Sequence, residues 1–441
     1  MKEYPAYKDS GYEWIGEIPN HWRIGKLKYF SYINPTKDSD LISKESEALV
    51  TFLPMEKVNE NGTYDVSLKR PTKELWSGFT YFEENDVIVA KITPCFENGK
   101  GALLKNLDGR IGFGSTEFHV LRAWPEISHP KFLYYLTQSH LFKTTGEAFM
   151  YGAAGQKRVP TNHVTDFPFS CPPYSEQQVI ADFLDCKTAQ IDSLSEKKQR
   201  QIDLLQEQRT ALINHAVTKG LNPDAPMKDS AVEWLGEIPS TWKMIRLRHI
   251  SPNISVGLVI QPSQYVDPVG TVPFLFGSNV RENAFLLDNV RKISEESNLK
   301  IANSMLHAGD LVTVRVGYPG VTAVVPPYLD GANCASMMVV RKSDFVLSEY
   351  LCYVMNSRVG MYQVETVQYG AAQKQFNISH AVDFVYPIPP VEEQEAIVNY
   401  LTKKSQGIYR LIGVLQTQIE RLQEYRTALI SEAVTGKIDV R

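Results

Sequence analysis

The sequence predicts an α+β protein with two mixed α/β domains separated by two long antiparallel coiled-coil helices, related by a pseudo-two-fold internal repeat. Three observations predict this architecture. The chain has 441 residues, more than one hydrophobic core usually organises. Several motifs occur twice, and each copy ends in a long stretch with apolar residues at helical spacing. We expect domains at 1–173 and 227–389, a helix and linker at 174–226, and a second helix at 390–441.

Composition is that of an ordinary globular protein. Hydrophobic residues make up 43% and charged residues 22%, and no apolar run reaches the roughly eighteen residues of a membrane span. The first residues lack the apolar core of a secretion signal, so we expect a cytoplasmic protein. The five cysteines are scattered without a CxxC pair, so neither a disulfide framework nor a structural zinc site is expected.

Net charge argues mildly against nucleic-acid binding. The formal value is -4, whereas contacts to phosphates normally need clustered Lys and Arg. A nucleic-acid partner therefore requires local basic clusters, or partner subunits that share the contact.

The first repeated motif opens each half of the chain. Residues 13–19 read Glu-Trp-Ile-Gly-Glu-Ile-Pro and are followed by Trp22. The same motif recurs 220 positions later as residues 233–239 and Trp242, with Leu235 in place of Ile15. A base-reading residue should differ between the halves, whereas a packing residue should repeat. We therefore expect core or helix-docking roles, rather than stacking on bases, for Trp14, Trp22, Trp234 and Trp242.

The second repeated motif is a glycine-rich segment that suits a surface loop. Residues 151–157 read Tyr-Gly-Ala-Ala-Gly-Gln-Lys, and residues 369–374 read Tyr-Gly-Ala-Ala-Gln-Lys. Glutamine can bond adenine, and Arg or Lys can bond guanine or phosphate. The candidate DNA contacts here are Gln156, Lys157, Arg158, Gln373 and Lys374. Their repetition favours phosphate contacts or a structural loop over base discrimination.

Between these motifs the two halves diverge. Segments 31–135 and 251–350 share little beyond a strand-like run at 86–90 and at 310–314, and short β-branched runs broken by Gly, Pro and Asn indicate sheet-containing domains. Residues that read bases should lie in these divergent segments. The candidates are Lys91, Asn98, Lys100, Arg281, Arg291 and Arg315, and for each the alternative is a solvated surface charge.

The third repeat predicts the two long helices. No Pro or Gly occurs between Pro173 and Gly220, which allows one helix of over forty residues. We assign a heptad seam for coiled-coil pairing and subunit docking in each copy. Its members are Ile180, Leu184, Ile191, Leu194, Leu205 and Leu212, then Ile397, Leu401, Ile408, Leu411, Leu415, Leu422 and Leu429. Gln201 and Gln418 occupy one seam position, as register-setting or merely tolerated polar residues, and Gly407 and Gly413 allow a kink.

The order of these motifs resembles a known family. The chain has a Trp-x-Gly-x-x-Pro-x-x-Trp opening, a variable domain, a Gly-x-x-Gln-Lys loop, and a Pro-Pro-x-x-Glu-Gln helix start leading to Arg-Thr-Ala-Leu-Ile. This order resembles the specificity subunit of type I restriction-modification systems over essentially the whole chain. Residues 91–100 and 114–118 also resemble one common type of target recognition domain in that family.

The resemblance implies a non-catalytic DNA-recognition subunit. Each variable domain would be a target recognition domain that reads one half of a bipartite, asymmetric double-stranded DNA target, and the helices would set the unread spacer. The helices would also bind two modification (methyltransferase) subunits, and restriction (translocase and nuclease) subunits would join them. No cofactor is expected on this chain, since S-adenosylmethionine, ATP and Mg would belong to the partner subunits.

Chemical motifs that could support other functions are weak. Cys171-Pro172-Pro173-Tyr174 resembles an adenine-methyltransferase loop, but Cys is a poor acceptor at its first position and a helix start explains the segment more simply. The glycines at 109, 112 and 114 lack a following long helix, no Walker A motif occurs, and the histidines lack metal-ligand spacing. Two alternatives stay open: a stand-alone DNA methyltransferase or nuclease with fused recognition domains, and a coiled-coil adaptor that does not bind DNA.

Overall fold

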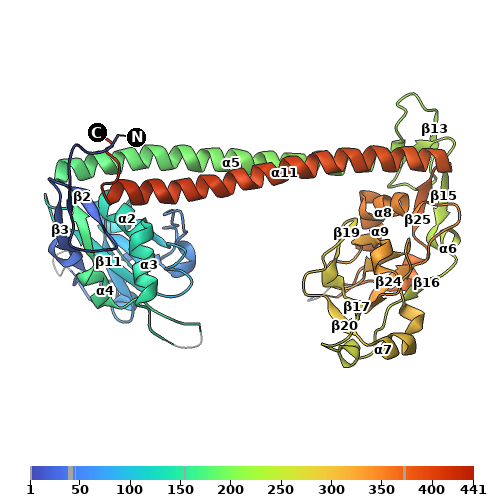
Figure 1. The fold of residues 1–441 in the computed structure, drawn as a ribbon, viewed down its shortest axis with the longest axis horizontal. Helices are drawn as coiled ribbons and strands as arrows, with labels where there is room; N and C mark the ends of the chain where they lie inside the picture. The colour runs from blue at the N-terminus through green and yellow to red at the C-terminus, as the bar shows by residue number, and fades with distance from the viewer. Residues whose placement is uncertain (1, 38–42, 45, 153–154, 371–373) are drawn as a thin grey trace. The chain divides into compact units, whose positions relative to one another are not determined.

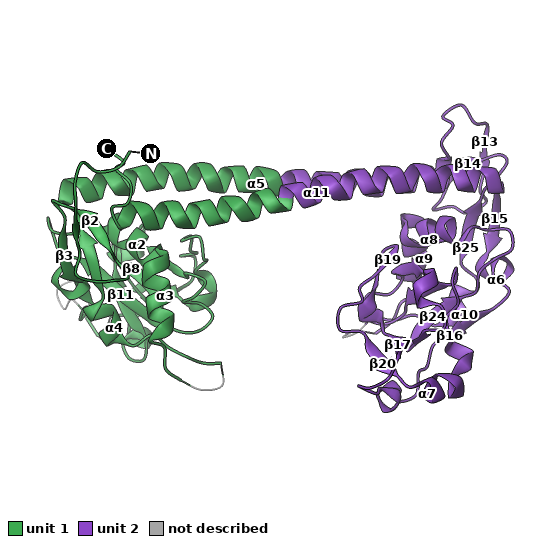
Figure 2. Cartoon of the chain, viewed as in Figure 1, with its two compact units in different colours: residues 1–199, 416–441 green, residues 200–415 purple. Residues whose placement is uncertain are grey.

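The computed structural model describes residues 2–37, 43–44, 46–152, 155–370 and 374–441. It divides into two compact units (Figure 2). Unit 1 comprises residues 1–199 and 416–441, and unit 2 comprises residues 200–415. Each unit therefore contains one globular domain and a part of both long helices. We call the globular domains head 1 (residues 1–173) and head 2 (residues 227–389).

Head 1 is built on two four-stranded sheets. One has the order β4-β11-β8-β9 and the other the order β6-β5-β10-β7. Helix α2 packs against strands of the first sheet, and two antiparallel strand pairs, β1-β2 and β3-β12, complete the domain. The elements are β1 (Tyr7–Asp9), β2 (Glu17–Pro19), β3 (Arg23–Lys26), β4 (Ser31–Ile33), β5 (Leu49–Leu53), β6 (Lys69–Pro71), α1 (Thr72–Leu75), β7 (Thr80–Glu83), β8 (Val87–Ala90), β9 (Gly101–Leu103), β10 (Ile111–Gly114), β11 (Phe118–Ala123), α2 (Pro130–Gln138), α3 (His140–Ala148), α4 (Thr161–Asp166) and β12 (Pro168–Cys171).

Head 2 repeats this plan with a smaller second sheet. Its sheets have the orders β16-β24-β21-β22 and β20-β17-β23, and the pairs β13-β14, β15-β25 and β18-β19 lie outside them. The elements are β13 (Met227–Asp229), β14 (Glu237–Pro239), β15 (Lys243–Arg246), α6 (Leu247–Ile250), β16 (Ile254–Val256), β17 (Val272–Leu275), β18 (Val280–Arg281), β19 (Ala284–Phe285), β20 (Arg291–Ile293), α7 (Glu295–Lys300), β21 (Leu311–Val314), β22 (Thr322–Val324), β23 (Asn333–Cys334), β24 (Met337–Val340), α8 (Ser348–Asn356), α9 (Arg358–Val367), α10 (Ile378–Ala381) and β25 (Val385–Ile388).

The two divergent heads share a buried ion pair at the same sheet register. Asp86 precedes the buried strand β8 and pairs with Arg122 at the end of β11, with Nη2 to Oδ2 at 2.8 Å. Asp310 precedes β21 and pairs with Arg341 directly after β24, at 2.5 Å. Both carboxylates are almost fully buried, so removal of either partner would leave an uncompensated charge in the core. The heads are therefore two versions of one fold.

Two long helices follow the heads in sequence, α5 (Tyr174–Lys219) and α11 (Val391–Val434). Within unit 1 they run antiparallel, because Asp192 pairs with Arg426 at 3.0 Å while Lys198 bonds Gln418 at 2.6 Å. In unit 2 the two helices also contact each other, because the Arg209 guanidinium lies 4.9 Å from the ring centre of Tyr409. Figure 1 shows α5 and α11 side by side within each unit. The predicted fold class is confirmed.

The isoleucines of the two long helices recur every 11 residues and most are buried, whereas the predicted seam follows a heptad. Leu194 and Leu411, both assigned to the seam, are 43% and 54% exposed, and Gln201 and Gln418 are exposed as well. An 11-residue repeat of 3.67 residues per turn almost matches a straight α-helix, whereas a heptad stripe requires a left-handed supercoil. The isoleucines that carry the repeat are Ile180, Ile191, Ile202 and Ile213 in α5, and Ile397, Ile408, Ile419 and Ile430 in α11; all are buried except the half-buried Ile419.

Other members of the predicted seam differ in burial. Ile180, Leu184, Ile191, Ile397, Leu401, Ile408 and Leu429 are buried, and Leu205, Leu212, Leu415 and Leu422 are half-buried. Gly407 and Gly413 lie within the continuous helix α11. Burial therefore follows most of the predicted stripe and departs from it at Leu194 and Leu411, while the pairing and docking roles of these residues stay predictions.

The second tryptophan of each opening motif fastens the long helices to a head. Trp22 is fully buried and its indole N–H donates to Glu176 in the first turn of α5, at 3.2 Å. Trp242 does the same to Glu393 in the first turn of α11, at 2.9 Å. A carboxylate here is also favoured by the helix dipole. The repetition of this tryptophan therefore has a structural cause.

The same tryptophans receive the end of the other helix. Gly436 follows α11 and Gly220 follows α5, with φ of 75° and 76°. A Cβ at Gly436 would lie 3.0 Å from Trp22, and one at Gly220 would lie 3.4 Å from Trp242. Glycine suits both the left-handed backbone and the close approach. In each unit one indole thus contacts the start of one helix and the end of the other.

The first tryptophan of each motif behaves differently from the prediction. Trp14 is 55% exposed. Trp234 is half-buried, and its ring centre lies 4.9 Å from that of Tyr362. The expectation of a core role is therefore wrong for Trp14, because repetition alone does not separate a buried residue from an exposed one.

Trp22→Ala should lower the free energy of unfolding by about 3–5 kcal/mol, because it leaves a cavity and deprives the buried Glu176 of a donor. Trp14→Ala, in the same motif, is the matched control and should change it by less than about 1 kcal/mol. Urea unfolding followed by circular dichroism measures both. Equal losses in the two variants would contradict the role given to Trp22.

Candidate nucleic-acid interface

The glycine-rich segment of head 1 forms a closed loop. Tyr151 and Arg158 exchange two backbone hydrogen bonds, of 3.2 and 2.9 Å. Gly152 has φ of 135°, and a Cβ there would lie 2.4 Å from the carbonyl oxygen of Gln156. Only glycine fits this position without displacing backbone. The exposed side chains of Gln156 and Lys157 follow at the closing side of the loop.

This loop is attached to the segment that leaves strand β8. Ile92 and Arg158 form a β-bridge. The Thr93 hydroxyl accepts a bond from the Lys157 backbone N–H at 2.8 Å and donates to the Lys157 carbonyl at 3.0 Å. The predicted residues Lys91, Gln156, Lys157 and Arg158, which are distant in sequence, are thereby brought together.

The cations of this cluster differ in what they already bind. Arg158 holds Glu117, with Nη2 to Oε1 at 2.8 Å, and this hydrogen bond raises the pKa of the Arg158 guanidinium. The Lys91 ammonium donates to the Thr116 carbonyl at 2.9 Å, and burial lowers the pKa of Lys91. Lys157 is exposed and its ammonium has no partner among the described residues. Lys157 is therefore the cation of this loop best placed to meet a phosphate.

Two further predicted residues of head 1 make internal contacts. The Asn98 amide donates to Glu60 at 2.7 Å, and the Lys100 ammonium donates to the Met55 carbonyl at 3.3 Å. Both bonds reach the segment that follows β5. Neither residue has a hydrogen bond to the described residues of the glycine-rich loop.

Head 2 contains the corresponding loop in the corresponding place. Tyr369 and Gln375 exchange two backbone bonds of 2.9 Å, and Gly370 has φ of 101°. Gln375 forms a β-bridge with Val316, after strand β21, and the Arg315 Nε donates to the Phe376 carbonyl at 3.2 Å. The exposed Lys374 is brought close to this strand end. Gln373 lies outside the described residues.

Arg281 and Arg291 line a hollow on head 2 with a volume of about 450 Å³. Asp288 and Asn289 also line it. Arg281 Nη1 donates to the carbonyls of residues 278 and 280, at 3.0 and 2.9 Å. The Arg291 guanidinium lies 4.7 Å from the ring centre of Phe276.

Sequence reasoning missed the comparable residue of head 1, Arg70. Its guanidinium lies 4.7 Å from the ring centre of Phe52. The two residues are on adjacent strands, β6 and β5. A search along the chain cannot find such a pair without the strand pairing, because the signal is a cross-strand neighbour and not a sequence motif.

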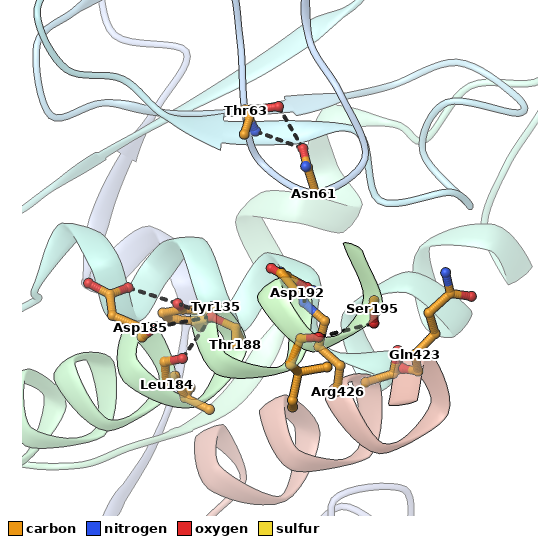
Figure 3. A network of polar contacts seen from close by, with 12 residues as sticks. Asn61, Thr63, Tyr135, Leu184, Asp185, Thr188, Asp192, Ser195, Gln423 and Arg426 are labelled. Carbon is orange, nitrogen blue, oxygen red and sulfur yellow. Dashed lines mark hydrogen bonds and ion pairs between the residues drawn. The ribbon is translucent and has the colours of Figure 1, made fainter. Parts of the chain in front are cut away.

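Head 1 is joined to both long helices by polar contacts (Figure 3). The Tyr135 hydroxyl on α2 donates to Asp185 of α5 at 2.7 Å. Arg426 of α11 donates from Nε to Asp192 of α5 at 3.0 Å. Because these bonds converge on one stretch of α5, the head and the two helices are held as one body within unit 1.

The arginine of the repeated Arg-Thr-Ala-Leu-Ile motif has the same task in both units. In unit 1 Arg426 pairs with an aspartate of the facing helix. Its counterpart in unit 2, Arg209, lies over the ring of Tyr409 on the facing helix and also pairs with Glu282 of head 2, at 3.0 Å. The two arginines contact different residues, but each joins its helix to the facing helix.

Beside each of these arginines, a set of mostly exposed residues also repeats between the two helices. Gln423, Glu424, Thr427 and Ala428 of α11 recur as Gln206, Glu207, Thr210 and Ala211 of α5. Thr427 is half-buried, and the other seven are exposed. We call these two sets the repeated helix surfaces. In unit 1 the surface lines a hollow of about 770 Å³ together with His140, Glu420, Ser431 and Glu432.

The motifs set aside as chemically weak make structural contacts. Cys171 is buried, and burial raises the pKa of its thiol to about 12. The Gln177 side chain donates to the Pro172 carbonyl at 3.0 Å and accepts from the His129 N–H at 2.8 Å, which fixes the start of α5. Within the described ranges, no group of three or more His, Cys, Asp or Glu side chains is arranged to hold a metal ion. Among the same residues, no helix is long and apolar enough to cross a membrane.

Comparison with known proteins identifies related chains. Residues 38–204 match the family model of the type I restriction modification DNA specificity domain. The EcoAI specificity subunit of Escherichia coli is 36% identical over 181 residues, which cover 41% of this chain and 30% of that protein. The EcoEI specificity subunit of Escherichia coli is 22% identical over 525 residues, which cover 98% of this chain and 85% of that protein.

Two solved structures share the fold. A chain from a structure of a type I R-M system superposes with a TM-score of 0.76 at 19% identity, covering 96% of this chain and 99% of that chain. The HsdS subunit from Thermoanaerobacter tengcongensis superposes with a TM-score of 0.55 at 18% identity, covering 96% of this chain and 98% of that chain.

Gly152→Ala should distort the loop of head 1, because the left-handed φ and the contact with the Gln156 carbonyl both oppose a Cβ; we expect a loss of roughly 1–3 kcal/mol. Hydrogen exchange at the backbone amides of Tyr151 and Arg158 should quicken. Gly407→Ala is the control, since a Cβ there meets nothing within 4 Å and should stabilise α11 by up to about 1 kcal/mol. Unchanged exchange in Gly152→Ala would show that the loop is not closed in solution.

Proposed function

We propose that this chain, which is similar to type I restriction enzyme specificity subunits, recognises DNA for such a system, each head reading one half of a bipartite, asymmetric target. One observation carries this proposal: a duplicated frame holds two heads of the same fold whose loop and sheet surfaces differ. Two heads with different surfaces, held by repeated motifs and helices, suit a DNA target whose two halves differ in sequence. Because its proposed ligand is double-stranded DNA, we assign the protein to the cytoplasm.

The long helices would fix the spacing between the half-sites. Two readers on one face of B-DNA must sit about one helical turn, or a multiple of it, apart. Both α5 and α11 are continuous helices that extend from one unit into the other. A rigid pair of helices, rather than a flexible linker, is what such a constraint needs.

The repeated helix surfaces are the proposed docking sites for two modification subunits. Exposed residues that recur in otherwise divergent halves meet the same partner twice, since no packing role preserves them. Glu420, Glu424 and Glu432 make the surface of unit 1 acidic, so the partner should present a basic or hydrogen-bond-donating surface. The exposed Leu194 and Leu411, which are equivalent positions in the two copies, offer an apolar contact on the same helices.

Chemistry would then reside on the partners. Methylation with S-adenosylmethionine is assigned to the modification subunits, and ATP- and Mg-dependent translocation and cleavage to restriction subunits. This chain would select the DNA sequence and position the partner subunits on it. A stand-alone methyltransferase or nuclease would need a cofactor loop or a metal-binding carboxylate cluster, and the glycines at 112 and 114 instead lie in strand β10, where a Cβ would meet backbone.

DNA binding by the purified chain should weaken steeply with salt, measured by filter binding to duplex DNA over a salt series. Lys157→Ala and Lys374→Ala should each reduce the slope of log K against log salt by about 0.9, because each removes one phosphate contact. Arg158→Ala should instead lower the melting temperature, because it leaves Glu117 without its partner. Binding that does not depend on salt would favour the adaptor alternative.

Docking at the repeated helix surfaces makes a prediction about stoichiometry. Ala428→Arg and Ala211→Arg should each remove one modification subunit from a complex of two, and the double variant should remove both, as measured by native mass spectrometry. Gln190→Arg is the matched control, since this exposed residue of α5 corresponds to Gly407 in α11 and does not repeat. Two bound subunits in the double variant would exclude these surfaces.

A further inference from the structure

The second sheets of the two heads have equivalent strands despite their different sequences. In head 1, β5 pairs antiparallel with the edge strand β6 and parallel with β10. In head 2, β17 pairs antiparallel with the edge strand β20 and parallel with β23. The strands β5, β6 and β10 therefore correspond to β17, β20 and β23.

An arginine occupies the same register on both edge strands. Arg70 of β6 lies opposite Val50, and Phe52 is two residues further along β5. Arg291 of β20 lies opposite Phe274, and Phe276 is two residues further along the neighbouring chain. In each head the guanidinium lies 4.7 Å from the centre of that phenylalanine ring.

This recurrence does not come from the duplicated frame. The two sheets lie in the segments of the heads that share little sequence, and the strands themselves read Lys-Arg-Pro and Arg-Lys-Ile. Folding requires a strand at this place but not an arginine, because both side chains are exposed at a sheet edge. The same arrangement has been kept in two surfaces that otherwise diverged.

Stacking leaves the charge of each arginine available. Among the described residues, neither the guanidinium of Arg70 nor that of Arg291 makes a hydrogen bond or an ion pair; each lies over a phenylalanine ring. The ring restrains the plane of the guanidinium, and its N–H donors lie in that plane, directed away from the ring. The neighbouring Lys69 differs in this respect, since it pairs with Asp108.

We propose that Arg70 and Arg291 are equivalent contacts to the DNA backbone, one in each head, which set the height and orientation of the head on the duplex. The inference rests on the proposed function and deepens it. A phosphate is the same at every base pair, so a contact shared by two heads with different half-sites should go to phosphate rather than to a base edge. Arg281 and Asp288, which share the hollow with Arg291, lie outside this equivalence.

The test compares Arg70→Ala, Arg291→Ala and the double variant by filter binding to specific and random duplex DNA over a salt series. Each single change should reduce the salt slope by about 0.9 and the double change by about 1.8, equally on both duplexes. Arg70→Lys and Arg291→Lys keep the charge and should retain the slope. Arg110→Ala is the control in head 1, since this exposed arginine pairs with Glu84 and lies over no ring among the described residues.

Methylation mapped in cells that carry each variant with its modification subunits supplies the second measurement. The methylated sequence should stay unchanged while its occupancy falls. A sequence relaxed at one position would overturn the assignment to phosphate, and an unchanged salt slope in both variants would overturn the contact itself. If the wild-type chain binds without salt dependence, the proposed function fails instead. Arg70→Gln and Arg291→Gln, which keep the size of the side chain, replace any alanine variant that melts below the assay temperature.

Discussion

The arrangement depends on a buried hydrogen bond between an indole and a carboxylate. Trp22 holds Glu176 and Trp242 holds Glu393, so each long helix begins on the head that precedes it. The glycine after the other helix packs on the same indole. A buried carboxylate is costly unless it is hydrogen-bonded, and in unit 1 Tyr4 also donates to Glu176, at 2.8 Å. This requirement fixes where both helices meet the head, and hence what the head can present.

Divergence is tolerated only beyond this frame. Asp86 with Arg122, and Asp310 with Arg341, hold the central strands of the two heads at one register although the surrounding sequences differ. The glycine-rich loops attach at the strand ends that follow, through β-bridges of Arg158 and Gln375. Loops and sheet edges can therefore change their side chains without loss of the fold, as a reader of different sequences requires.

Sequence reasoning recovered the features that repeat along the chain and lost those that depend on pairing. The duplicated tryptophans, the loops and the two helices follow from the repeats. The predicted heptad includes Leu194 and Leu411, which are exposed, because apolar spacing along the chain does not tell which residues are covered. Lys91 was predicted apart from Lys157 and Arg158, and the fold brings the three together, but Arg158 already forms an ion pair with Glu117. Arg70 was missed because its signal is a ring on the adjacent strand.

Burial decides what a repeated residue means. Trp22 and Trp242 repeat because they are enclosed, so a change at either would disturb the contact between head and helix. Gln206, Glu207 and Ala211 repeat with Gln423, Glu424 and Ala428 although these residues are exposed. Within the part of the chain that the structure describes, no side-chain contact accounts for their identity. Arg70 and Arg291 are a third case, because they have the same strand register although the sequences around them differ. Exposed residues that repeat, either in identity or in strand register, indicate a binding partner that is the same for both halves of the chain. Such a partner is a subunit bound twice, or the phosphate backbone of a DNA duplex.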